Sequence, residues 1–295
     1  MTSAGRRPNL FLVGAMKCGT TSLHNTLAGH PSIFMCQRPK EPNWFAGGNS
    51  GKSLDWYLER FAGATDESYV GESSTDYTRA PRLKCPAAKI REFSPDARIL
   101  YLVRDPVARA ISHYWWDVEY SAEGRSFPDA MTASREIIDI GNYAMQIEPY
   151  LETFGRDRVH VLTMEALTAE PEETLAAVFG FLGLDSVAAT PPALKHDNRG
   201  KAVVPRVPGP FSHLKGTPLW KAAKAVMPAK FRRKAIAALA KPVERVIPDD
   251  DFAAGLEIIR PRMIEETARL SRLLGREFPE WRALHDGVAS ADSSA

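Results

Sequence analysis

An apolar run that ends in a glycine-rich turn is the feature that most constrains how this chain can fold. Residues 9–13 (NLFLV) are mostly apolar without alternation, which is typical of a strand buried in a parallel sheet. Gly14 and Gly19 bound the turn, and leucines four residues apart predict a helix over 21–27. Such a turn exposes backbone N–H groups at the positive end of a helix dipole, so the sequence predicts an anion-binding loop.

The rest of the chain alternates between strand-like and helix-like patterns. Apolar runs predict strands over 69–71, 98–103 and 158–163, and spaced apolar residues predict helices over 54–61, 171–182 and 252–274. Pro261 is expected to kink or break the last of these helices. We therefore predict an α/β fold with a central parallel β-sheet flanked by helices on both faces.

The 295 residues are enough for one large hydrophobic core, and 44% hydrophobic with 25% charged residues is ordinary for a globular protein. We expect a single domain over 9–285, with flexible tails at 1–8 and 287–295. Segment 211–246 is basic with interleaved apolar residues, and we predict a helical insertion or cap there. It is interpreted as a solvated helical pair, with peripheral membrane contact or a cover over an acceptor pocket as alternatives.

Charge and cysteine content narrow the function classes. The net charge of +2, from 38 basic and 36 acidic residues, argues against a general nucleic-acid-binding protein. The three cysteines form no CxxC pair, so we expect no disulfide framework or zinc site and a reducing, cytoplasmic location. Arg6 and Arg7 before the first apolar run resemble a secretory signal, but Gly14 and Lys17 interrupt that run, which favours a buried strand.

The glycine turn departs from the usual nucleotide P-loop, GxxxxGK[ST]. Its two glycines have the right spacing, but Thr20 stands where that loop has its lysine, and the lysine lies inside the turn as Lys17. A lysine there would reach the bridging oxygen between a 5′-phosphate and a leaving group. An ordinary glycine turn before a helix is the alternative interpretation.

A second anion-binding motif follows the strand predicted over 98–103. Arg104 stands at the strand tip, where open α/β sheets place ligands, and Asp105-Pro106 predicts the start of a helix. Ser112 on that helix could share a phosphate with Arg104. By itself this pattern also fits an N-capped helix with surface arginines.

Together the two motifs resemble those of the sulfotransferases that use 3′-phosphoadenosine 5′-phosphosulfate (PAPS). The first is similar to the family's 5′-phosphosulfate loop, and the motif from Arg104 to Ser112 is similar to its 3′-phosphate motif. The loop residues expected to bind the donor are Lys17, Cys18, Gly19, Thr20, Thr21 and Ser22. The resemblance covers most of 9–285, and it implies a P-loop-like fold and a donor bound without a metal ion.

The resemblance also implies a catalytic base. One branch of the family uses a histidine, and the branch similar to heparan-sulfate-type enzymes uses a glutamate in a Lys-Glu context. This chain has Lys40-Glu41 followed by Phe45, which is similar to the glutamate branch. Glu41 is therefore the expected base, Lys17 the expected catalytic cation, and Lys40 a residue that holds the acceptor or the sulfate. A solvated Lys-Glu pair in a proline-rich loop is the alternative interpretation.

Two further assignments follow from the resemblance. Glu72 is expected to orient Lys17 or the acceptor, with simple pairing to an arginine as the alternative, and Ser73 stands where the glutamate branch often has a lysine. The loop residues Arg199, Gly200 and Lys201 are similar to a late segment that approaches the 3′-phosphate, with an irregular basic loop as the alternative.

The combined expectation is transfer of a sulfuryl group from PAPS to an acceptor hydroxyl on a carbohydrate, a lipid or a small secondary metabolite. The hydroxyl oxygen would attack sulfur in line, with Glu41 as general base. Two alternatives stay open at this stage: a P-loop kinase or NTPase, and a catalytically inactive nucleotide-binding protein.

Overall fold

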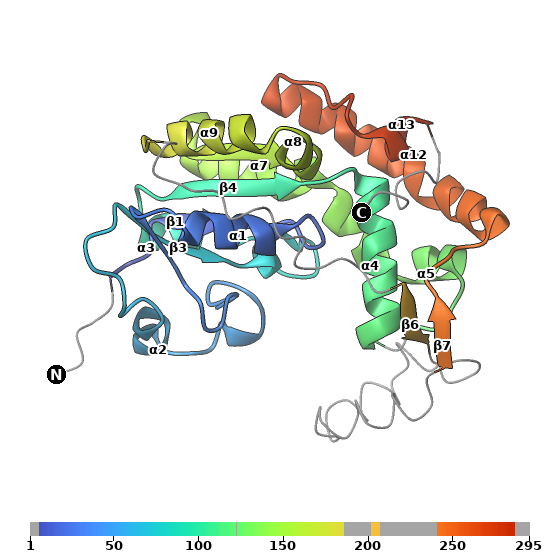
Figure 1. The fold of residues 1–295 in the computed structure, drawn as a ribbon, viewed down its shortest axis with the longest axis horizontal. Coiled ribbons are helices and arrows are strands. Elements are labelled where there is room, and N and C mark those ends of the chain that lie inside the picture. Colours follow the sequence, from blue (N-terminus) through green and yellow to red (C-terminus); the bar gives the residue numbers. More distant parts are fainter. Residues whose placement is uncertain (1–5, 122, 186–201, 207–240, 287–295) are drawn as a thin grey trace.

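The computed structural model describes residues 6–121, 123–185, 202–206 and 241–286. They contain a five-stranded parallel sheet in the order β2-β3-β1-β4-β5, flanked by helices, so the predicted fold class is confirmed (Figure 1). The strands are β1 (Leu10–Leu12), β2 (Ile33–Met35), β3 (Tyr69–Ser73), β4 (Arg98–Val103) and β5 (Val159–Thr163).

Helices cover the sheet, with α1 in front of it and α3 behind it in Figure 1. The helices before the basic segment are α1 (Thr20–Ala28), α2 (Leu54–Glu59), α3 (Ala87–Phe93), α4 (Pro106–Ser121), α5 (Phe127–Ala133), α6 (Arg135–Gly141), α7 (Tyr143–Phe154), α8 (Met164–Ala169) and α9 (Pro171–Leu182). Those after it are α12 (Asp249–Leu274) and α13 (Arg282–Asp286), and short 3₁₀ turns are η1 (Gly47–Asn49), η2 (Thr75–Thr78) and η3 (Arg156–Arg158).

The central position of β1 decides where a ligand can bind. All three β1 residues are fully buried, because β1 pairs with β3 on one side and β4 on the other. The chain therefore crosses over β1 between β3 and β4, and parallel sheets bind ligands at such a switch point, outside the carboxyl ends of the strands. The segments that leave these ends are the glycine turn, residues 74–78 and the start of α4.

The long C-terminal helix does not break at its proline, which was one of the two predicted outcomes. Helix α12 continues through Pro261 without ending there. Pro261 and Glu257, the residue one turn earlier, are both exposed, so water can satisfy the carbonyl group that the proline leaves without a donor.

Two segments in the structure also differ from their predicted bounds or type. The Arg6 guanidinium donates to the carbonyl oxygens of Thr65 (3.2 Å) and Glu67 (2.8 Å), so the tail predicted to be flexible over 1–8 is held from residue 6. Strand β7 (Lys241–Glu244) pairs antiparallel with β6 (Val203–Arg206), so the described end of the predicted helical insertion is a strand. Most of 211–246, and the tail 287–295, lie outside the described residues.

Candidate active site

The turn between β1 and α1 has the conformation of an anion-binding loop. Gly19 precedes α1 at φ 85°, in the left-handed region that glycine adopts most easily, and it has no side chain with which to cap the helix. Gly14 packs so closely on η2 that a Cβ would collide with the Thr78 hydroxyl. Lys17 also has a positive φ of 72°, which is strained for a residue with a side chain and typical of functional sites. The first N–H groups of α1, ahead of Ser22, whose own N–H donates to the Gly19 carbonyl oxygen at 3.0 Å, are thus placed to bind a ligand.

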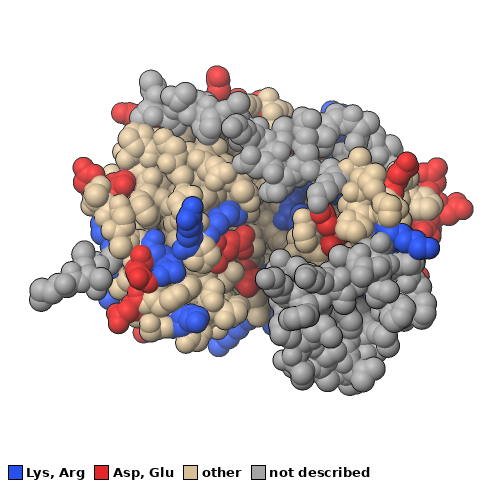
Figure 2. Space-filling view, turned by 60° about the horizontal axis from the view of Figure 1, so that its bottom comes forward, with Lys and Arg blue, Asp and Glu red and all other residues tan. Residues whose placement is uncertain are grey.

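Lys17 lies in a concentration of positive charge. Its pKa is lowered, first because the side chain is buried and then because of the charges of Arg245 and Arg104, with Glu119 acting in the opposite direction. A bound polyanion would relieve this repulsion. Figure 2 shows basic and acidic side chains on both sides of a hollow in the surface. Sequence reasoning noted Arg245 only as part of a basic segment, because nothing local indicates that it approaches Lys17.

The segment around Arg104 is held by backbone contacts on both sides. The Tyr143 hydroxyl donates to the carbonyl oxygen of Arg104 at 2.8 Å. Asp105 caps α4 by accepting from the N–H groups of Val107 (2.9 Å) and Ala108 (3.2 Å), as its sequence position predicts. Ser112 lies on α4, partly buried. The two predicted anion motifs therefore lie at the same edge of the sheet.

Glu41 lies beside the anion-binding loop, and Lys40 contacts both. The Lys40 ammonium is 3.3 Å from Glu41 Oε1 and donates to the Thr20 hydroxyl at 3.4 Å. The Thr75 hydroxyl donates to Glu41 Oε2 at 2.9 Å. The Glu41 side chain is 32% exposed, so a ligand in solution can reach this carboxylate. These contacts put a candidate base and a cation at the mouth of the anion-binding loop.

Glu72 lies behind this surface and not on it. Its side chain is 0% exposed, so it is not placed to touch an acceptor, and Lys17 is not among its hydrogen-bond partners. Burial raises the pKa of Glu72 from its ordinary 4.5 to about 7, although three hydroxyl donors lower it. The direct role expected from the sequence therefore does not fit this position.

The other predicted loop residues fall into two groups. Cys18 is fully buried against the Tyr143 hydroxyl (3.6 Å), and burial raises its pKa to about 11, so its side chain is not placed to touch a ligand. Thr20 is buried, and Thr21 and Ser22 are partly buried at the start of α1. The predicted contacts at 199–201 lie outside the described residues.

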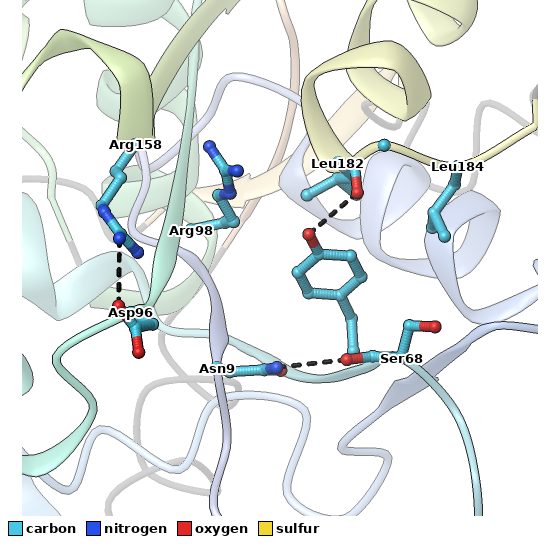
Figure 3. A pocket seen from close by; sticks show the side chains of 9 residues that line it. Asn9, Ser68, Asp96, Arg98, Arg158, Leu182 and Leu184 are labelled. Atoms are coloured by element: carbon cyan, nitrogen blue, oxygen red, sulfur yellow. Dashed lines mark hydrogen bonds and ion pairs between the residues drawn. The ribbon is translucent and has the colours of Figure 1, made fainter.

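A cavity of about 380 Å³ lies at the opposite edge of the sheet (Figure 3). Its lining includes Asn9, Ser68 and Arg98, which precede or begin β1, β3 and β4, so it faces the amino ends of the strands. It is separate from the site described above. Among the described residues, no group of three His, Cys, Asp or Glu side chains is arranged to hold a metal ion, and no helix is long and apolar enough to cross a membrane.

Comparisons with known proteins agree on one family. A family model described as "Sulfotransferase domain" matches residues 7–196, more than half of the chain. Heparan sulfate glucosamine 3-O-sulfotransferase 3A1 of Mus musculus is 30% identical over 192 residues, which is 61% of this chain and 47% of that protein. Bifunctional heparan sulfate N-deacetylase/N-sulfotransferase 4 of Mus musculus is 28% identical over 199 residues, 60% of this chain and 22% of that protein. The chain thus spans less than half the length of these curated relatives.

A solved structure extends the likeness to nearly the whole chain. The crystal structure of a sulfotransferase from Alicyclobacillus acidocaldarius matches with a TM-score of 0.61 and 27% identity. That match covers 94% of this chain and 99% of the other. The similarity therefore includes the C-terminal elements beyond the family match.

Proposed function

Because the chain belongs to the sulfotransferase domain family, we propose that it transfers a sulfuryl group from PAPS to a hydroxyl group of an acceptor molecule. The observation that carries the proposal is the contact chain Thr20–Lys40–Glu41, in which one ammonium group touches both the anion-binding loop and an accessible carboxylate.

The residues of the loop fit a donor with anionic groups at both its 5′ and 3′ positions. The uncapped start of α1 and Lys17 suit a 5′-phosphosulfate, and Arg104 with Ser112 suits a 3′-phosphate. Arg245 adds a third cation near Lys17. PAPS, when bound, supplies the activated sulfuryl group that the acceptor oxygen attacks.

In the proposed reaction, Glu41 removes the proton from the acceptor hydroxyl. The new oxygen–sulfur bond forms as the bond from sulfur to the phosphate oxygen breaks, and the electron pair of that bond leaves with the bisphosphate. Lys17 stabilises the negative charge that develops on this oxygen. Lys40 directs the Glu41 carboxylate toward the loop, since its ammonium group contacts Oε1 directly.

The names of the relatives favour a carbohydrate acceptor. Their printed names describe sulfation of heparan sulfate at an oxygen or a nitrogen. We propose a sugar hydroxyl as the first acceptor to examine, with lipid and small secondary-metabolite hydroxyls as the other classes.

The test is transfer from PAPS to a panel of glycans, lipid alcohols and phenols, with Glu41→Gln beside the wild type. Loss of the base should lower kcat by roughly 10²–10⁴-fold while leaving the affinity for the product 3′-phosphoadenosine 5′-phosphate (PAP) unchanged. Glu59→Gln is the control, because Glu59 is an exposed carboxylate on α2. Wild-type turnover by Glu41→Gln would remove Glu41 from the mechanism.

A further inference from the structure

The buried carboxylate of Glu72 takes no part in the proposed reaction, yet it is the centre of a hydrogen-bonded cluster behind Glu41. Its Oε1 accepts from the hydroxyl groups of Tyr57 (2.6 Å) and Tyr77 (2.9 Å). Its Oε2 accepts from the Ser74 hydroxyl at 2.6 Å. A carboxylate accepts on both oxygens, whereas the amide of a glutamine accepts on one and donates from the other.

Each of these three hydroxyl-bearing residues also holds one residue of the segment 43–45, which begins two residues after Glu41. The Asn43 N–H donates to the Ser74 hydroxyl at 3.0 Å, and the Phe45 N–H donates to the Tyr77 hydroxyl at 3.2 Å. The Trp44 ring stacks on the Tyr57 ring, with centroids 4.7 Å apart and planes 10° apart. Three consecutive residues are thus held by the three side chains that donate hydrogen bonds to the Glu72 carboxylate.

The segment needs such support, because its first residue is strained. Asn43 has a φ of 49°, in the left-handed region, and a turn of this kind persists only where its surroundings hold it. The next residue after Ser74 is Thr75, whose hydroxyl binds the Glu41 carboxylate itself. Residues 72–77 therefore hold both the Glu41 side chain and the backbone that follows it.

We propose that Glu72 is a positioning residue, whose carboxylate fixes the segment 43–45 through Tyr57, Ser74 and Tyr77 and thereby directs Glu41 toward the anion-binding loop. This inference rests on the proposed role of Glu41. It assigns Glu72 no contact with donor or acceptor. Burying a carboxylate costs stability even when hydroxyl groups donate to it, so the contribution of Glu72 lies in the geometry of the site.

Hydrogen exchange on the full chain tests the positioning without any acceptor. In Glu72→Gln, the amides of Asn43 and Phe45 should exchange about tenfold faster, which corresponds to the loss of roughly one hydrogen bond per link. The control is Tyr69→Phe, which removes a hydroxyl bonded to the Leu182 carbonyl oxygen (2.8 Å) at the other end of β3. Unchanged exchange at both amides in Glu72→Gln would overturn the inference, whatever the role of Glu41.

Kinetics separate a positioning role from a merely structural one. Ser74→Ala and Tyr77→Phe each remove one link and leave the Glu72 carboxylate in place. Both should lower kcat by about tenfold and leave the KM for PAPS unchanged, measured with the acceptor found in the panel or with water as acceptor in PAPS hydrolysis. If Glu41→Gln loses activity while these variants keep wild-type kcat, the positioning role is wrong and the proposed function stands. If Glu41→Gln keeps full activity, the proposed base is wrong, and amide exchange alone decides whether Glu72 holds the segment.

Discussion

Lys40 joins the donor side and the acceptor side of the proposed reaction centre through a single ammonium group. It contacts the Thr20 hydroxyl at the start of α1 and the Glu41 carboxylate in the following loop. The Lys40 and Glu41 side chains are 23% and 32% exposed, so their ion pair contributes little to stability in water. The value of the pair therefore lies in where it places the carboxylate.

Replacing Lys40 by methionine should separate activity from stability. We expect Lys40→Met to lower kcat at least about tenfold, while the free energy of unfolding changes by less than about 1 kcal/mol. Steady-state kinetics and urea denaturation measure the two effects. Lys52→Met, at an exposed lysine in the same loop region, is the control. Wild-type kcat in Lys40→Met would show that the bridge is incidental.

The raised pKa of Glu72 makes a prediction about stability and pH. The folded-state pKa is about 7 against an ordinary 4.5, so the folded protein binds this proton more tightly than the unfolded chain does. The groups that face Glu72 are Tyr57 from α2, Tyr77 from η2, Cys36 after β2, and Glu41. The contribution of Glu72 to stability is therefore greatest below pH 4.5 and is lost as the pH rises to 7.

Glu72→Gln removes this titration. Relative to the variant, the wild type should lose on the order of 3 kcal/mol of stability as the pH rises through that range, since each unit of pKa shift corresponds to about 1.4 kcal/mol. Urea denaturation of both proteins at pH 5 and pH 8 measures most of the difference. Parallel pH dependence in the two proteins would mean that Glu72 titrates near its ordinary pKa.

At the scale of elements, Asp105 connects the end of β4, the start of α4 and the C-terminal helix α13. Oδ1 caps α4, and Oδ2 accepts from the Leu284 N–H at 3.0 Å across 179 positions of sequence. The proposed 3′-phosphate ligands Arg104 and Ser112 lie on either side of this anchor. Their relative placement therefore depends on it.

Asp105→Ala should lower both stability and donor affinity. We expect the free energy of unfolding to fall by about 2–3 kcal/mol, because α4 loses its cap and the buried N–H of Leu284 loses its acceptor. We also expect a weaker affinity for PAP. Ser126→Ala is the matched control, because Ser126 caps α5 away from the site by accepting from the Asp129 N–H at 3.4 Å. Ser126→Ala should lower the free energy of unfolding by about 1 kcal/mol and leave the affinity for PAP unchanged. Equal PAP affinity in Asp105→Ala and the wild type would contradict the proposed role of this anchor.

The elements that the sequence predicts well are those with long, local patterns. The strand over 98–103 and the helix over 171–182 have the predicted bounds. Strand β2 was missed, and so were α5, α6 and α7, which follow one another with only single residues between them. The pairing of β6 with β7 joins residues far apart in the chain, which no local pattern can indicate.

The same distinction applies to the site. The glycine turn and the segment from Arg104 to Ser112 are each contiguous, so their chemistry is readable from sequence. The cluster around Glu72 combines α2, the end of β3 and η2, and Arg245 approaches Lys17 from beyond β7. These contacts exist only after folding, which is why Glu72 was expected to act directly and Arg245 was not singled out.

For the molecule as a whole, parallel pairing explains why distant segments meet. Because β1, β3 and β4 run in the same direction, the residues that follow them gather at one edge of the sheet. The cations of that edge include Lys17, Arg104 and Arg245, although the chain as a whole has a net charge of only +2. This concentration favours a ligand with several negative charges.

We propose that this edge binds the PAPS nucleotide through Arg104 without a metal ion. Calorimetry of PAP binding in EDTA, beside ATP, tests it most directly, with Arg104→Ala and with Arg98→Ala as control at the opposite end of β4, in the cavity of Figure 3. We expect PAP to bind without a metal ion and more tightly than ATP, with an affinity that falls on the order of 100-fold in Arg104→Ala and is unchanged in Arg98→Ala. No binding of PAP, or binding of ATP only when Mg²⁺ is present, would contradict this proposal and favour a P-loop kinase or NTPase.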